Sequence, residues 1–294
     1  MKLHQFGMAA AAGIAMLAIA PAAHAACSYN ETIQEPTRRS RVDGAVVSRI
    51  LSEADQALAS QQFDEACVKY RLILSVERDN TQARLGMGEG ALGEADFASA
   101  RVYFQTILER DANNAAALQG LGLAHLMSGD MEAAGAQLRL AVDANPALWR
   151  AWNGLGVVAD TRSEWDAADA AWAAAIAAAP NEAGIHNNKG MSLLQRGSPA
   201  SAIPAFNEAL RLKPNLVAAA SNRRIALAMT GAYDAALAGV SEEDLPAALN
   251  NVAIAAARRG DIAVADRLLA AAVTASPRYY EVAERNRDLL RSSR

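Results

Sequence analysis

Alanine recurs along this chain with a period of 34 residues. The series runs Ala66, Ala100, Ala134, Ala168, Ala202 and Ala236, and Ala265 follows after a shorter step of 29 residues. The residue twelve positions before each alanine is small, with Arg224 as the exception, and the residue four positions after it is bulky and apolar. A fixed period of this length is typical of repeat proteins, in which each module stacks only on its neighbours. The chain is therefore predicted to fold as a row of similar modules.

The residue types within one period indicate two antiparallel helices. Helices approach closely only where side chains are small, so the Gly or Ala of the first helix is expected to face the Ala of the second. The bulky residue four positions later shares that face and fills the space beside the contact. Glycines suit the turn that ends the first helix, and prolines stop the second helix. These residues are Gly129, Gly197, Gly231 and Gly260, and Pro146, Pro180, Pro214 and Pro277. The hydrophobic content of 52%, nearly half of it alanine, agrees with an all-α protein.

This pattern resembles the tetratricopeptide repeat. Two segments match the 34-residue pattern of this repeat along almost their whole length. They are AAALQGLGLAHLMSGDMEAAGAQLRLAVDANPAL, residues 115–148, and WRAWNGLGVVADTRSEWDAADAAWAAAIAAAPNE, residues 149–182. Seven repeats are predicted, starting at residues 47, 81, 115, 149, 183, 217 and 246. The resemblance implies an all-α solenoid over residues 47–279 with a capping helix over residues 280–294. Repeat 6 is cut short by GVSEEDLP, so a kink or gap is expected before repeat 7.

The N-terminus has the layout of a secretory signal peptide over residues 1–25. Lys2 precedes an apolar run, and Ala23-His24-Ala25 gives a small-x-small cleavage pattern. A polar arm, residues 26–46, follows. The mature chain is therefore expected in the periplasm or secreted. The alternative is a lipoprotein anchored to the outer membrane through Cys27, although His24 stands where lipoprotein signals carry an apolar residue.

The chain has two cysteines, Cys27 and Cys67, which lie 40 positions apart. In an oxidising compartment they could form a disulfide, which would contribute about 3–4 kcal/mol by the loop-entropy model. Two alternatives stay open. Cys67 could be a small apolar filler on a helix, and Cys27 could carry the lipid.

No catalytic or cofactor site is predicted. His125 and His186 have no second ligand or nucleophile at a suitable spacing, and neither a phosphate-binding loop nor a metal-ligand spacing occurs, so neither an enzyme nor a cofactor is expected. The formal net charge is −4, and it becomes −5 once Lys2 leaves with the leader, which argues against nucleic acid as a partner. The leader is too short to span a bilayer and no later segment is apolar enough, so no transmembrane span is expected.

Amide side chains recur at positions 5 and 6 of the predicted repeats, on the first helices that line the concave side of such a stack. They are Gln119, Asn153, Asn187, Asn188, Asn222, Asn250 and Asn251, and position 9 beside them holds Leu123, Val157, Met191, Ile225 and Ile254. Amides can both donate to and accept from a peptide backbone, so the row predicts a groove for an extended peptide or protein client. The alternative is that these amides bridge neighbouring repeats. The lysine and arginine pair that grips a carboxylate in chaperone-binding members is missing, and Arg150 stands near these positions alone.

The C-terminal third supports a narrower resemblance. It combines the short repeat 6 with SEEDLPAALNNVAIAAARRGDIAVADRLLAAAV and SPRYYEVAERNRDLL. These features resemble the tetratricopeptide component of tight-adherence (Flp) pilus assembly. The resemblance implies a non-catalytic scaffold that helps to assemble the outer-membrane secretin or other pilus parts. Two interpretations stay open beside it: a periplasmic accessory subunit that regulates an envelope enzyme of the cell wall, and a solenoid that associates with itself.

Overall fold

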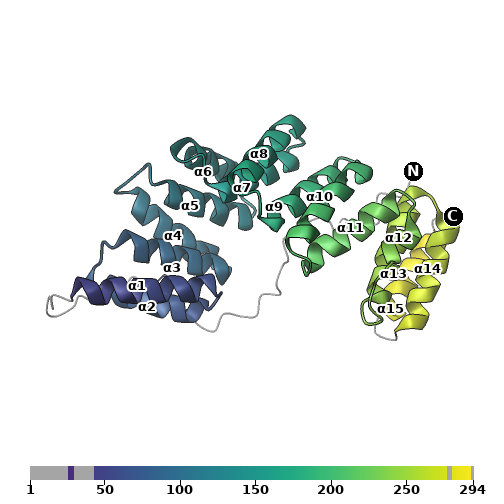
Figure 1. Ribbon diagram of the computed structural model, residues 1–294, viewed down its shortest axis with the longest axis horizontal. Coiled ribbons are helices and arrows are strands. Elements are labelled where there is room, and N and C mark those ends of the chain that lie inside the picture. The colour runs from purple at the N-terminus through teal and green to yellow at the C-terminus, as the bar shows by residue number, and fades with distance from the viewer. Residues whose placement is uncertain (1–25, 30–42, 277–279, 293–294) are drawn as a thin grey trace. The chain divides into compact units, whose positions relative to one another are not determined.

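The computed structural model describes residues 26–29, 43–276 and 280–292 (Figure 1). The predicted signal peptide, residues 1–25, and most of the polar arm lie outside the described residues. Within the described ranges the chain forms fifteen helices and no strand. The helices are α1 (Gly44–Ala59), α2 (Phe63–Val76), α3 (Thr81–Gly93), α4 (Phe97–Leu108), α5 (Ala115–Met127), α6 (Met131–Ala144), α7 (Trp149–Thr161), α8 (Trp165–Ala178), α9 (Ala183–Gln195), α10 (Pro199–Leu212), α11 (Val217–Met229), α12 (Tyr233–Leu237), α13 (Leu245–Arg259), α14 (Ile262–Ala275) and α15 (Tyr280–Ser292). The all-α class predicted from the sequence is confirmed.

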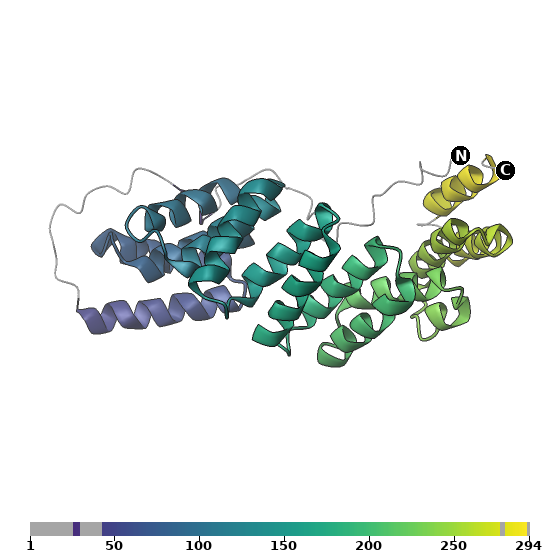
Figure 2. The ribbon, with the colours of Figure 1, turned by 90° about the horizontal axis from the view of Figure 1, so that it is seen from above.

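The helices fall into two compact units, which are described separately. The N-terminal unit ends at Pro180 and holds α1–α8, and the C-terminal unit starts at Asn181 and holds α9–α15. Within each unit consecutive helices pack as antiparallel pairs (Figure 2). Helices α3, α5, α7, α9 and α11 begin at the residues where five of the seven repeats start in the sequence. Helix α1 begins at Gly44, because the Asp43 side chain accepts from the backbone N–H of Ala45 and caps the helix there.

Within each unit the first helices of successive pairs also pack on one another. In the N-terminal unit α1 contacts α3, α3 contacts α5, and α5 contacts α7. In the C-terminal unit α9 contacts α11, α11 contacts α13, and α13 contacts α15. We call the exposed side of these odd-numbered helices the inner face of each unit. It is the surface on which the sequence places the amide row.

In α3, α5, α7 and α9 a glycine makes room for a large side chain of the second helix of the pair. A Cβ atom at Gly88 would lie 2.6 Å from the Phe104 ring, and one at Gly156 would lie 2.6 Å from the Trp172 ring. The small residue therefore faces the bulky residue more closely than it faces the repeat alanine, which differs from the expected pairing. The cause is the size of the ring, since only a glycine leaves space for an aromatic side chain between two helices.

Repeat 6 has the short second helix expected from the sequence, but no gap follows it. Helix α12 has 5 residues and ends before Gly239, whose φ of 71° breaks the helix. Ala228, Ala236, Val252 and Ala255 form one buried cluster that joins α11, α12 and α13. Of the kink or gap expected between repeats 6 and 7, the gap is therefore filled by apolar side chains, and the kink stays a prediction.

Candidate protein-binding surface

All residues of the predicted groove lie on odd-numbered helices. Gln119 and Leu123 lie on α5, Asn153 and Val157 on α7, Asn187, Asn188 and Met191 on α9, Asn222 and Ile225 on α11, and Asn250 and Asn251 on α13. The division into two units separates this set. The residues of α5 and α7 belong to the N-terminal unit, and those of α9, α11 and α13 belong to the C-terminal unit.

Two position-5 amides of the C-terminal unit, Asn187 and Asn250, accept hydrogen bonds from the next first helix, and the donor to Asn187 is the position-6 amide Asn222. The side-chain amide of Asn222 donates to Asn187 Oδ1 at 3.0 Å, which links α11 to α9. On α15, the Asn286 amide donates to Asn250 Oδ1 at 2.8 Å, which links it to α13. Asn187 and Asn250 are only 7% and 6% exposed. These two amides therefore hold the stack together and lie too deep to be the first contact of a client.

Amides at position 6 are more open to solvent. Asn188 and Asn222 are half-buried, and Asn251 is exposed. Asn188 Oδ1 accepts from the Asn187 amide at 3.3 Å, so the inner and outer amides of α9 are connected. Three residues later along each helix, on the same face, stand Met191, Ile225 and Ile254, which are all half-buried. The inner face of the C-terminal unit thus offers a row of amides beside a row of apolar side chains.

The inner face of the N-terminal unit carries an ion pair. Arg150 Nη1 donates to both carboxylate oxygens of Glu89, at 3.0 and 2.9 Å. Glu89 lies on α3 and Arg150 on α7, so the pair joins two helices that flank α5, on which Gln119 and Leu123 are buried. The Arg150 guanidinium is therefore paired with a carboxylate of its own unit. Glu89 holds position 9 of its repeat, as Asp55 does in the first repeat, and this position is apolar in the five later repeats. A comparison of all seven repeats at that position would have set these two acidic residues apart.

His125, Trp152 and Trp172 contact other residues of the N-terminal unit. His125 Nδ1 lies 3.2 Å from an Asp130 carboxylate oxygen. The Trp152 ring N–H donates to the Pro146 carbonyl at 2.8 Å, and Trp172 is buried in the core. Among the residues that the structure describes, no group of three or more His, Cys, Asp or Glu side chains could hold a metal ion.

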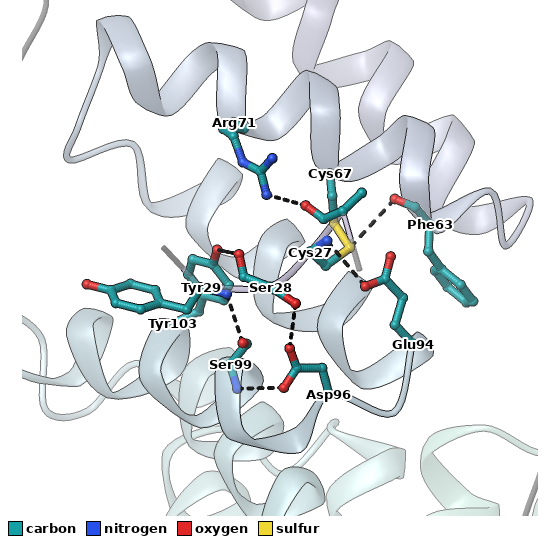
Figure 3. Close-up of a disulfide and its surroundings, with 11 residues drawn as sticks. Cys27, Ser28, Tyr29, Phe63, Cys67, Arg71, Glu94, Asp96, Ser99 and Tyr103 are labelled. Carbon is teal, nitrogen blue, oxygen red and sulfur yellow. Dashed lines mark hydrogen bonds between the residues drawn. A yellow bond between two sulfur atoms is a disulfide. The ribbon is translucent and has the colours of Figure 1, made fainter. Parts of the chain in front are cut away.

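A disulfide fastens residues 26–29 to the N-terminal unit. Cys27 and Cys67, whose Cα atoms are 5.2 Å apart, are bonded through their sulfur atoms, and both are fully buried (Figure 3). Gly90 on α3 lies directly against the bond. A Cβ atom there would come within 2.4 Å of the Cys67 sulfur and 2.6 Å of the Cys27 sulfur. Gly90 is therefore required for the disulfide to fit between the segment, α2 and α3.

Backbone groups of the fastened segment are bound by side chains of the helices around it. The Cys27 N–H donates to Glu94 Oε2 at 3.2 Å, and the Arg71 guanidinium donates to the Ala26 carbonyl. Burial raises the pKa of the Glu94 carboxyl above its usual range, and the bond from Cys27 partly offsets that rise.

The other end of the segment docks on α4. Ser28 Oγ donates to Asp96 Oδ2 at 2.9 Å, and the Tyr29 N–H donates to Ser99 Oγ at 2.8 Å. The rings of Tyr29 and Tyr103 meet edge to face with their centroids 5.3 Å apart. Burial raises the pKa of the Tyr103 hydroxyl to about 12. The sequence predicted the disulfide only as one alternative and gave no signal for these contacts, because each joins residues 68 or more positions apart.

Two family models for the tetratricopeptide repeat match the chain, over residues 91–156 and 153–217. The chain carries tetratricopeptide repeats. The matched stretch runs from the end of α3 to the start of α11, and paired helices of the same kind continue on both sides of it. No curated protein matches the sequence.

Solved tetratricopeptide repeat structures share the fold. The protein TTC0263 of Thermus thermophilus is 19% identical, with a TM-score of 0.56 over 62% of this chain and 98% of its own. A tetratricopeptide repeat protein of Parabacteroides merdae is 13% identical, with a TM-score of 0.54 over 84% of this chain and 99% of its own. A chain of the APC/C hetero-tetramer Cut9–Hcn1 is 17% identical, with a TM-score of 0.63 over 79% of this chain and 49% of its own. These likenesses support the fold and say nothing of a partner.

Proposed function

We propose that this protein is an exported, non-catalytic scaffold that holds an extended segment of a partner protein on the inner face of its C-terminal unit. The observation that carries the proposal is the regular row of position-6 amides, Asn188, Asn222 and Asn251, on three successive first helices. Each repeat offers the same polar group beside an apolar residue. An extended chain presents backbone groups and side chains at a regular rise, and it could bind one repeat after another along such a row.

The disulfide between Cys27 and Cys67 favours an oxidising compartment as the place where this protein functions. Disulfides persist in the periplasm and outside the cell and are rare in the cytosol of most organisms. Because the Cys27 sulfur is bonded to Cys67, it has no thiol left to carry a lipid. Of the two localisations derived from the sequence, this favours a periplasmic or secreted protein over an outer-membrane lipoprotein anchored through Cys27. None of the helices in the described part of the chain has the length and hydropathy that a membrane span needs.

The partner, on this proposal, belongs to the assembly of tight-adherence (Flp) pili. The support is the C-terminal third, where the short α12 and the closing helix α15 are the features that carried the resemblance to that family. Pilus secretin or pilin subunits among the proteins captured from native envelopes would agree with this partner. Capture of cell-wall enzymes in their place would contradict it.

Replacing Asn188 and Asn251 together by Ala is expected to weaken capture of the partner from native envelope extract about tenfold. Loss of two hydrogen bonds of about 0.5–1.5 kcal/mol each accounts for that factor. The matched control replaces the position-5 amides Asn187 and Asn250, which are buried bridges. The control is expected to lower the melting temperature, whereas the position-6 variant keeps it. Capture by the position-6 variant at the wild-type level, in quantitative mass spectrometry, would refute the groove.

A further inference from the structure

Helix α5 has no side that is open to solvent along much of its length. Eight consecutive residues of this helix, 117–124, are all buried, and they make about two turns. The first helices that follow it keep an amide at the surface, which is half-buried or exposed, namely Asn153 on α7, Asn188 on α9, Asn222 on α11 and Asn251 on α13. The inner side of α5 is therefore covered by other parts of the N-terminal unit.

The apolar row at position 9 shows the same contrast. Leu123 of α5 is 8% exposed, whereas the residues at this position in the four later repeats are all half-buried, namely Val157, Met191, Ile225 and Ile254. Gln119, which lies one turn before Leu123 on the same face, is also 8% exposed. The amide and the apolar side chain that α5 contributes to the inner face are therefore both closed off.

The ion pair between Glu89 and Arg150 crosses α5 on this side. Glu89 lies on α3 and Arg150 on α7, and each of these helices packs against α5. The second helices α4 and α6 also pack against α5, and they cover it from the outer side. A direct contact of 2.9 Å between Glu89 and Arg150 therefore passes over the inner side of α5.

The repeat register shows which residues lie beneath the pair. Leu123 stands one repeat of 34 residues after Glu89, and Ala116 stands one repeat before Arg150. Equivalent positions on stacked first helices lie side by side, so the line from Glu89 to Arg150 crosses α5 between the levels of Leu123 and Ala116. Gln119 lies between these two residues on the same face, three positions after one and four before the other.

A link of this kind is unusual in a stacked repeat fold. Each repeat of a solenoid contacts mainly its immediate neighbours, but Glu89 belongs to the second repeat and Arg150 to the fourth. The Arg150 guanidinium binds both oxygens of the carboxylate, at 3.0 and 2.9 Å, and this two-point contact gives the pair a defined geometry. The pair therefore ties together two repeats that α5 separates.

The pair is also accessible enough to open. The side chains of Arg150 and Glu89 are 37% and 26% exposed, so solvent reaches both charges. Ion pairs open to solvent change an equilibrium by about fivefold or less. The closed arrangement is therefore favoured by a small factor, and a competing charge on either side chain is sufficient to release it.

We propose that Glu89 and Arg150 form a strap that closes the inner face of the N-terminal unit over α5, and that Gln119 and Leu123 become accessible when the strap opens. The open unit offers an amide beside an apolar side chain, which is the composition of the open row on the C-terminal unit. Helix α5 is thus a latent surface of the same kind. The inference concerns access to α5 alone, so its test needs no partner and is separate from the test of the proposed function.

A single new cysteine reports on the strap, because the two native cysteines are bonded to each other. Gln119→Cys places a thiol beneath the strap. Leu121→Cys places one two residues further along, on the opposite side of a helix with about 3.6 residues per turn. Leu121 is 4% exposed, so its thiol reacts only when α5 separates from the unit, and this makes it the matched control. The rate of labelling by an uncharged thiol reagent is measured without reductant.

Each thiol is placed in four backgrounds: the wild type, Glu89→Arg, Arg150→Glu, and the two changes together. Each single change puts like charges side by side and is expected to speed the labelling of Gln119→Cys about fivefold, the factor that such a pair supplies. The double change restores opposite charges and is expected to bring the rate back close to that of the wild type. Leu121→Cys is expected to stay slow in all four backgrounds.

Equal labelling of Gln119→Cys in the four backgrounds would overturn the proposal. A double variant that labels as fast as the single variants would overturn it as well, because the charges would then not control access. Labelling of Leu121→Cys that rises together with that of Gln119→Cys would also count against the strap, since it would show that the variants loosen α5 as a whole.

Discussion

Replacing Cys27 and Cys67 together by Ala is expected to lower the free energy of unfolding of the N-terminal unit by about 3–4 kcal/mol. The disulfide closes a loop of 40 residues and so removes conformational freedom from the unfolded chain. It also holds residues 26–29 against α3 and α4, where the segment makes the hydrogen bonds to Glu94, Asp96 and Ser99. Alanine is chosen because both sulfur positions are fully buried and a serine would add an unpaired hydroxyl.

Chemical denaturation with and without a reductant measures this effect. Reductant is expected to bring the wild type down to the stability of the double variant, while the variant itself does not respond. The same midpoint for oxidised wild type and double variant would show that the bond contributes nothing. Equal stabilities could not be reconciled with a segment that is tied to the unit by a buried disulfide.

Replacing Phe104 by Ala is expected to cost about 3–5 kcal/mol. The ring is fully buried and bridges two pairs of helices, since Cβ atoms at Gly88 of α3 and Gly120 of α5 would lie 2.6 and 2.3 Å from it. Neither glycine has a side chain that could move into the cavity left by the ring. Because repeats are stabilised by their immediate neighbours, the loss falls on the contact between α3, α4 and α5.

Denaturant titration of the variant, followed by circular dichroism, gives the size of this loss. The matched control is Leu140→Ala, which shortens an apolar side chain of α6 that is 51% exposed. The control is expected to change the free energy of unfolding by about 0.5 kcal/mol or less. If Phe104→Ala cost no more than the control, the small-to-large register of the repeat would be wrong.

The fold could be predicted from the sequence because the same residue pattern recurs in successive repeats. One small residue followed sixteen positions later by a bulky one is a weak signal, but this spacing recurs at Gly88 and Phe104, Gly156 and Trp172, and Gly190 and Phe206. The pattern therefore predicts the helical pairs and the face that each buries. It could not predict the filled contact after α12, because the cluster around Ala236 and Val252 depends on how a short helix lets its neighbours close up.

The candidate surface was only partly predictable. The sequence places amides on the inner face, but it does not separate Asn187, which bridges to Asn222, from Asn188, which is more open. That distinction depends on the distance between α9 and α11. The pairing of Glu89 with Arg150 was not predictable for a similar reason, because it depends on how α3, α5 and α7 pack and not on the spacing of the two residues in the sequence.

Site-specific photo-crosslinking tests the central claim, that the inner face of the first helices holds the partner, most directly. A photoreactive residue in place of Asn251 on α13 is compared with one in place of Ala271, which is exposed on α14 of the same pair. In native envelopes the residue at position 251 is expected to form an adduct with the partner, and the residue at position 271 is expected to form none. An adduct from position 271 alone would contradict the account.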